Sequence, residues 1–229
     1  MQKFFHYVIE HKLVSLGISF LLFLACLIGF GQIADEVHEG ETLWIDETIL
    51  QTINGFSNSF WDAFFVTITQ LGGVIGIITL TIGLLLVLTL RHKRRAAFVL
   101  ALTVGGAALL NLVLKLIFER ARPDLWDQLI VETSYSFPSG HAMLSAALAL
   151  AVIYIFWTTR YRWPVAVSAS LYILVIGLSR LYLGVHYPTD IVAGWLVSGA
   201  WLLVVVVVTN SEYLHGKLRI LSPFHKRTT

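Results

Sequence analysis

The feature that most restricts the fold of this chain is a series of long apolar runs. We place six of them, at residues 13–33, 64–90, 96–118, 140–158, 163–183 and 189–209. A helix of about 20 apolar residues crosses the hydrocarbon core of a bilayer. The mean hydropathy of +0.77 is too high for an ordinary soluble protein. We therefore predict an all-α integral membrane bundle of six transmembrane helices, folded as one domain over residues 1–229.

The first run begins after Lys3 and Lys12 and so has the outline of a secretory signal. A run of about 20 residues is longer than the apolar region of a usual signal peptide, and no small-x-small cleavage site follows it. We predict that it remains in the protein as a membrane anchor. Cys26, the one cysteine, lies within this run and is expected to behave as a small buried hydrophobe.

Positive charge is distributed unevenly between the two ends of the predicted spans. All 16 Lys and Arg residues except Lys115, Arg120, Arg122 and Arg180 lie near the termini or in the connections at 91–95 and 160–162. Cytoplasmic loops carry such an excess of cations, so we predict that these segments and both termini are cytoplasmic. The connection 34–63 is acidic and has no Lys or Arg, and we expect it outside, with the four exceptional cations near that face.

Two patterns leave alternatives open. In the connection 34–63, Ile45, Ile49 and Ile53 are spaced as on a helix face. That helix either lies in the membrane interface or packs on the ends of the spans. Glycines recur in several runs, as at 72–73 and 105–106. They favour close helix packing, the alternative being the broken helices of a transporter.

Polar residues near the predicted external face form three groups, and such residues beside membrane segments are usually functional. Lys115 and Arg122 come first, seven positions apart, which places both on one helix face if the helix continues to Pro123. Since only four cations are expected near this face, we interpret Lys115 and Arg122 as parts of an anion site. Arg120 fits better as a residue that reaches the headgroups or pairs with Glu119.

The second group is Pro138-Ser139-Gly140-His141, directly before the fourth run. A helix start with free backbone N–H groups binds anions, Ser139 adds a hydroxyl and Gly140 allows a close approach to the backbone. His141 is expected in the first helical turn, near the bound group.

The third group is Ser179-Arg180, followed by His186 and Asp190. Arg180 offers a planar fork for two oxygens of one phosphate. Pro188 suits the first position of a helix. Asp190, four residues after His186, is then close enough to accept a proton from one imidazole nitrogen and to direct the other toward substrate.

The three groups resemble the signature of the type 2 phosphatidic acid phosphatase superfamily, whose members resemble vanadium haloperoxidases at the active site. That signature is Lys, six residues, Arg-Pro; then Pro-Ser-Gly-His; then Ser-Arg, five residues, His, three residues, Asp. Every fixed position is matched, and the match covers residues 115–190. The six predicted spans agree with the membrane branch of the superfamily.

The resemblance implies a metal-independent phosphatase without a cofactor. His186 would attack phosphorus to form a phosphohistidine, Asp190 would orient it, and His141 would protonate the leaving group and later activate water. These roles require a neutral His186 and, with phosphate bound, a protonated His141. The phosphate oxygens would be held by Lys115, Arg122, Ser139, Gly140 and Arg180.

A site at the external membrane face implies a lipid phosphate that arrives from the bilayer. Among the bacterial phosphatidylglycerophosphatases that the chain most resembles, the substrate is phosphatidylglycerophosphate, and we expect it here. Undecaprenyl diphosphate, phosphatidic acid and diacylglycerol pyrophosphate remain as alternatives. The expected location is the plasma membrane of a bacterium, with membrane lipids as partners and no obligate protein partner evident.

Three other classes of protein fit less well. A haloperoxidase is soluble, and a transporter would place its ionisable residues near the middle of the bilayer instead of at one face. The net charge of +2 is too small to indicate a nucleic-acid partner.

Overall fold

The computed structural model describes the backbone of residues 2–40 and 43–221, and the side chains of residues 14, 16–40 and 43–210. Within these ranges the chain forms helices and no strand, which confirms the all-α prediction. The elements are α1 (Gln2–Glu39), α2 (Leu43–Asn54), α3 (Ser59–Ile68), a 3₁₀ turn η1 (Thr69–Leu71), α4 (Val74–Leu90), α5 (Arg94–Phe118), α6 (Gly140–Phe156), α7 (Arg162–Tyr182) and α8 (Pro188–Leu221).

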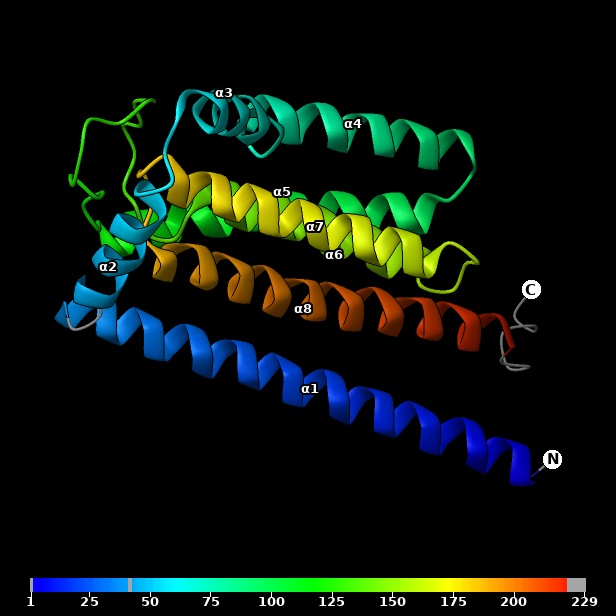
Figure 1. Ribbon diagram of the computed structural model, residues 1–229. Coiled ribbons are helices and arrows are strands. Elements are labelled where there is room, and N and C mark those ends of the chain that lie inside the picture. Colours follow the sequence, from blue (N-terminus) through cyan, green and yellow to red (C-terminus); the bar gives the residue numbers. More distant parts are fainter. Residues whose placement is uncertain (1, 41–42, 222–229) are drawn as a thin grey trace.

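The long helices run alongside one another, and α2 lies across one end of the bundle (Figure 1). Helix α6 is central, because it packs against α4, α5, α7 and α8, while α1 packs along α8. Small buried residues such as Ala142, Ala146 and Ala149 allow these helices to approach α6 closely. The connection 34–63 thus contains α2, which lies across the ends of the long helices (Figure 1).

The six predicted spans are not confirmed when each span is required to be a helix long and apolar enough to cross a membrane. Over the described residues, four helices are long and apolar enough to cross a membrane: Leu16–Glu39, Arg94–Phe118, Arg162–Tyr182 and Pro188–Asn210. A fifth is obtained by joining Ser59–Leu71 to Val74–Leu90 across a bend of 48°. The remaining predicted run corresponds to α6, which has 17 residues.

Glycines have both of the roles that the sequence left open. A Cβ on Gly106 would lie 2.3 Å from the Trp201 ring, so this glycine permits α5 and α8 to pack closely. Gly76, by contrast, follows the bend in the second predicted run, and a Cβ there would lie 2.2 Å from the Gln70 carbonyl oxygen. The predicted run 64–90 is therefore two helices, since the chain bends where it lacks side chains.

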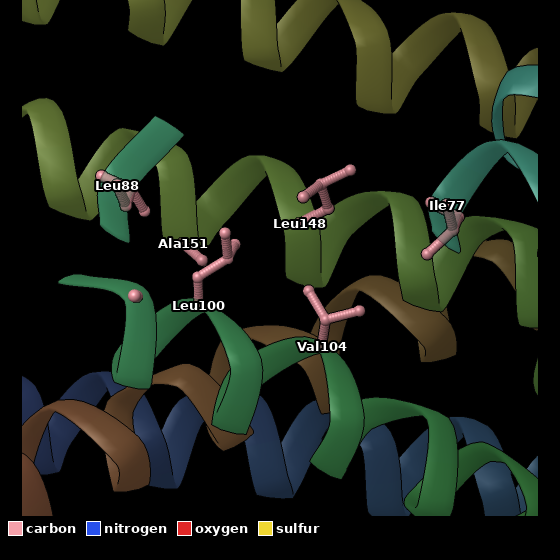
Figure 2. Close-up of a cluster of buried hydrophobic side chains, with 7 residues drawn as sticks. Ile77, Leu88, Leu100, Val104, Leu148 and Ala151 are labelled. Carbon is pink, nitrogen blue, oxygen red and sulfur yellow. The ribbon is translucent and has the colours of Figure 1, made fainter. Parts of the chain in front are cut away.

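The largest apolar core lies between α4, α5 and α6 (Figure 2). It is built from the following buried side chains: Ile77, Leu88, Ala97, Leu100, Val104, Leu148 and Ala151. Large apolar side chains such as Leu21, Ile75, Leu109 and Leu171 are exposed on the outside of the bundle. Such an exposed apolar surface is suited to contact with lipid.

The connections α4–α5 and α6–α7, which contain Arg91 and Arg160, lie at the end of the bundle opposite α2 (Figure 1). In the described part of the chain, these cations therefore lie at the opposite end of the bundle from Lys115, Arg120, Arg122 and Arg180, as the sequence predicts. The side chains of Lys3, Lys12, Lys217, Arg219, Lys226 and Arg227, which also entered that prediction, lie outside the described residues.

Candidate active site

Lys115 is in the last turn of α5, but Arg122 is not on that helix. The helix ends at Phe118, and Glu119 follows in the left-handed conformation with φ of 45°, its N–H donating to the Lys115 carbonyl oxygen. The prediction that two helical turns join Lys115 to Arg122 is therefore wrong. The loop between α5 and α6 instead brings them together: Lys115 Nζ donates to Ser134 Oγ at 2.8 Å, and Arg122 Nε donates to the Ser134 carbonyl oxygen at 2.7 Å.

The segment Pro138–His141 forms the start of α6, as predicted. Ser139 is the N-cap, and its hydroxyl accepts a hydrogen bond from Ala142 N at 3.4 Å. Gly140 permits a close approach, because a Cβ there would lie 3.1 Å from Asn111 Oδ1. Ser139 is fully buried, so its hydroxyl supports the helix start, and His141 in the first turn is the side chain presented to the adjacent cavity.

His186 and Asp190 form a buried pair at the start of α8. His186 Nδ1 lies 3.2 Å from Asp190 Oδ2, and His186 Nε2 lies 3.1 Å from Arg122 Nη1. A guanidinium can only donate, so Nε2 accepts and the proton is on Nδ1, where it is donated to Asp190. In this tautomer the free lone pair of the ring is on Nε2, the atom that a nucleophilic histidine would use.

Besides His186, the Asp190 carboxylate is held by two groups from the loop between α5 and α6 and by one backbone N–H just before α8. Its Oδ2 also accepts from the Ser136 hydroxyl and, at 2.9 Å, from Tyr187 N. Its Oδ1 accepts from Arg120 Nη1 at 2.6 Å. Because these bonds hold the buried carboxylate in one position, the orientation of His186 depends on Ser136 and Arg120 of the loop as well as on Asp190.

Arg120 is a residue that sequence reasoning placed wrongly. Its Nη2 donates to Asp46 Oδ2 of α2 at 2.9 Å while Nη1 binds Asp190. Asp46 also accepts from the backbone N of Thr189 at 3.1 Å. Arg120 therefore does not reach outward to the headgroups; it joins two buried carboxylates. Its membership in the small group of external cations was the available signal, whereas nothing distinguished Asp46 from its acidic neighbours.

Arg180 is fully buried behind the cavity. Its Nη1 donates to Thr69 Oγ1 at 3.0 Å, and its Nη2 donates to Glu132 Oε1. Its Nε is buried and has no hydrogen-bond partner among the described residues. Glu132 is a second residue that the sequence did not identify, since the connection it occupies has no helical periodicity.

One cavity of about 640 Å³ joins these groups. Its polar end is lined by Lys115, Arg122, Gly140, His141 and His186, together with Glu132 and Ser134 of the loop. The cavity continues between α4 and α5 along apolar side chains that include Ile78, Ile82, Ala101, Val104 and Leu112. Of the predicted site residues, Arg180 and Asp190 contact this polar lining from behind, and Ser139 lies beneath it.

Burial and charge determine the protonation of this site. Burial, followed by the positive charges of Arg122, Arg180 and Lys115, lowers the pKa of His186 well below its usual value of 6.5. The imidazole is therefore neutral at physiological pH, as a nucleophile must be. Burial raises the pKa of Glu132, but the guanidinium groups of Arg180 and Arg122 outweigh it and lower that pKa, so the carboxylate is ionised.

Among the described residues, no group of three or more His, Cys, Asp or Glu side chains is arranged to hold a metal ion. The charged groups of the polar lining are mainly cations. Such a set is suited to an anion, and the apolar continuation of the cavity is suited to a hydrocarbon chain.

Known proteins with similar sequences act on lipid phosphates. Phosphatidylglycerophosphatase B of Bacillus subtilis is 29% identical over 190 residues, which cover 81% of this chain and 88% of that protein. Lipid A 4'-phosphatase of Bacteroides thetaiotaomicron is 33% identical over 69% of this chain and 75% of its own length.

The fold has a solved counterpart. The crystal structure of a transmembrane PAP2-type phosphatidylglycerolphosphate phosphatase from Bacillus subtilis matches with a TM-score of 0.76 and 26% identity, and the match covers 82% of this chain and 96% of that one. The family model described as PAP2 superfamily matches residues 96–213, which contain all three polar groups of the candidate site. Because the family model covers more than half of the chain and the whole of the candidate site, the chain belongs to the PAP2 superfamily.

Proposed function

We propose that this chain hydrolyses phosphatidylglycerophosphate to phosphatidylglycerol and inorganic phosphate through a phosphohistidine intermediate, without a metal or cofactor. The chain is a membrane phosphatase of the PAP2 family, related to phosphatidylglycerophosphatase B, so the proposal concerns its substrate and mechanism. The observation that carries it is the cavity, in which cations and two histidines lie at one end of an apolar groove.

The shape of the cavity supports a substrate that is half lipid. Its polar end is lined by cations and two histidines, and its apolar continuation lies between α4 and α5, whose outer faces are themselves apolar. A lipid that slides in from the bilayer keeps its chains in an apolar environment throughout and exposes only its phosphate to the cations. We assign this face to the outside of a bacterial plasma membrane, because the opposite connections carry the other cations.

The chemistry follows from the hydrogen bonds of His186. Arg122 turns from His186 Nε2 to a phosphate oxygen and thereby frees the lone pair. Nε2 then bonds to phosphorus while the bond from phosphorus to the glycerol oxygen breaks, and this oxygen takes a proton from His141. Asp190 accepts the hydrogen bond from Nδ1 and balances the positive charge that develops on the ring.

The second step releases phosphate. His141, now neutral, removes a proton from a water molecule, whose oxygen attacks phosphorus as the bond from phosphorus to Nε2 breaks. The charge on the phosphate oxygens is stabilised in both steps by the backbone N–H groups at Gly140 and by the side chains of Lys115, Arg122 and Arg180. Positioning and charge stabilisation are most of what phosphoryl transfer requires from a protein.

The test is phosphate release by the detergent-purified protein in excess EDTA. Phosphatidylglycerophosphate, phosphatidic acid and undecaprenyl diphosphate are offered in parallel, with His186→Ala as the inactive control. We expect the first lipid to be cleaved fastest, and the variant to lose at least about 10³-fold in kcat. Faster cleavage of another lipid would show that the proposed substrate is wrong and would leave the proposed mechanism standing. Activity only after a divalent metal is restored would exclude the metal-independent mechanism.

A further inference from the structure

Glu132 places a carboxylate among the cations that the proposed function assigns to phosphate. Its Oε1 accepts from Arg180 Nη2, and its Oε2 lies 3.7 Å from Arg122 Nη2. The side chain is 25% exposed and lines the polar end of the cavity beside both histidines. An acidic side chain thus lies where an acidic ligand is expected.

The carboxylate contacts the same guanidinium groups that a phosphate needs. A carboxylate and a phosphate both present oxygens with the spacing that a guanidinium fork recognises. Arg180 Nη1 is committed to Thr69, and Nη2 is the nitrogen that reaches the cavity lining through Glu132. A phosphate that approaches Arg180 from the cavity therefore meets the like charge of Glu132, which already accepts from Nη2 and lines the cavity.

We propose that Glu132 is an internal anion that occupies Arg180 and Arg122 when no substrate is present and that the phosphate group of the lipid displaces. The proposal rests on the phosphatase function proposed above. Glu132 neutralises part of a buried group of cations, which lowers the cost of keeping them together without a ligand. It also competes with inorganic phosphate, and so it speeds the release of the product from a strongly basic site.

A purely structural role for the same ion pair predicts the opposite result. If Glu132 served only to hold Arg180 in the correct position, its removal would misplace the guanidinium and weaken phosphate binding. If Glu132 competes, its removal frees two guanidinium groups and strengthens binding, because a like charge beside the bound anion is lost. The sign of the change in phosphate affinity therefore decides between the two roles.

The experiment is isothermal titration calorimetry of inorganic phosphate into detergent-purified protein at one ionic strength. Wild type is compared with Glu132→Gln, which keeps the shape and removes the charge. Asp127→Asn is the matched control, since Asp127 lies exposed in the same loop and its substitution also removes one negative charge. We expect the Kd for phosphate to fall about tenfold in Glu132→Gln and to change less than about twofold in Asp127→Asn.

An unchanged or higher Kd in Glu132→Gln overturns the proposal and leaves the phosphatase function intact. An equal fall in Asp127→Asn also overturns it, because the effect would then be one of net charge. If no variant binds phosphate, the phosphate site itself is wrong and both proposals fail. If Glu132→Gln does not fold, Glu132→Asp is used instead, because its side chain is one methylene shorter and its carboxylate lies farther from the two guanidinium groups. The Glu132→Asp protein must then bind phosphate more tightly than wild type does.

Discussion

At the scale of single residues, the candidate site is a set of charges that compensate one another in a buried position. His186 is neutral between Arg122 and Asp190, Asp190 is shared with Arg120, and Arg120 is shared with Asp46. Each member keeps its neighbour in the required protonation state and orientation. Changes at residues that never contact the substrate should therefore alter the rate.

Arg120 is the residue for which this expectation is sharpest. Arg120→Lys keeps a positive charge but cannot donate to Asp46 and Asp190 with one planar fork, so we expect kcat to fall at least about tenfold while the Kd for inorganic phosphate stays within about twofold. Arg120→Ala leaves two buried carboxylates without their shared cation and should lower the free energy of unfolding by about 3–5 kcal/mol. A parallel loss of phosphate binding in Arg120→Lys would show that Arg120 acts on the ligand directly.

The lowered pKa of His186 gives a prediction for pH dependence. Because burial and the neighbouring cations lower this pKa well below 6.5, His186 stays unprotonated as the pH falls through that value. The acid limb of kcat/KM due to His186 should therefore lie well below pH 6.5. Below pH 6.5 the unfolded chain binds a proton that the folded chain does not, so stability falls with decreasing pH until the pKa of the folded state is passed. An acid limb at or above pH 6.5 would contradict a buried, neutral nucleophile.

At the scale of helices, the apolar part of the cavity lies between α4 and α5. Gly105 lines it, and a Cβ at this position meets nothing within 4 Å. Gly105→Leu should therefore fill the groove without strain. We expect KM for a long-chain lipid phosphate to rise about tenfold, with little change for a water-soluble phosphate ester.

Gly83 provides the matched control for this substitution. It lies within α4, a Cβ there also meets nothing within 4 Å, and it does not line the cavity. Gly83→Leu should leave both KM values close to those of wild type. Equal effects of the two substitutions on KM would place the lipid chain elsewhere.

At the scale of the whole molecule, the bundle separates its two ends by charge. The loop between α5 and α6, with Asp127, belongs to the end that carries α2, and the connection with Arg160 belongs to the other (Figure 1). In a Cys26→Ala background, we expect Asp127→Cys to react with a membrane-impermeant thiol reagent added to intact cells. Arg160→Cys should react only after the membrane is permeabilised. The reverse pattern would place the candidate site in the cytoplasm and the proposed orientation would be wrong.

The amino-acid sequence alone predicts the class of fold and the three polar groups from which the candidate site is built. Apolar runs of sufficient length located α5, α6, α7 and α8 closely, since a helix in lipid must be long and apolar. The sequence also predicted relations between residues close together in the chain. Examples are the position of His141 in the first turn of α6 and the pairing of His186 with Asp190 four residues later. These relations depend only on helix geometry over a few residues.

The partners that come from distant segments depend on how the helices and loops pack together. The contacts of Arg120 with Asp46 and of Arg180 with Glu132 join α2 and the loop before α6 to residues far away in the chain. No periodicity encodes such pairs, because loop geometry and helix packing determine which charges meet. The sequence left the bend at Gly72–Gly73 as one of two alternatives for the same reason: glycines permit both close packing and a break, and the packing of neighbouring helices selects between them.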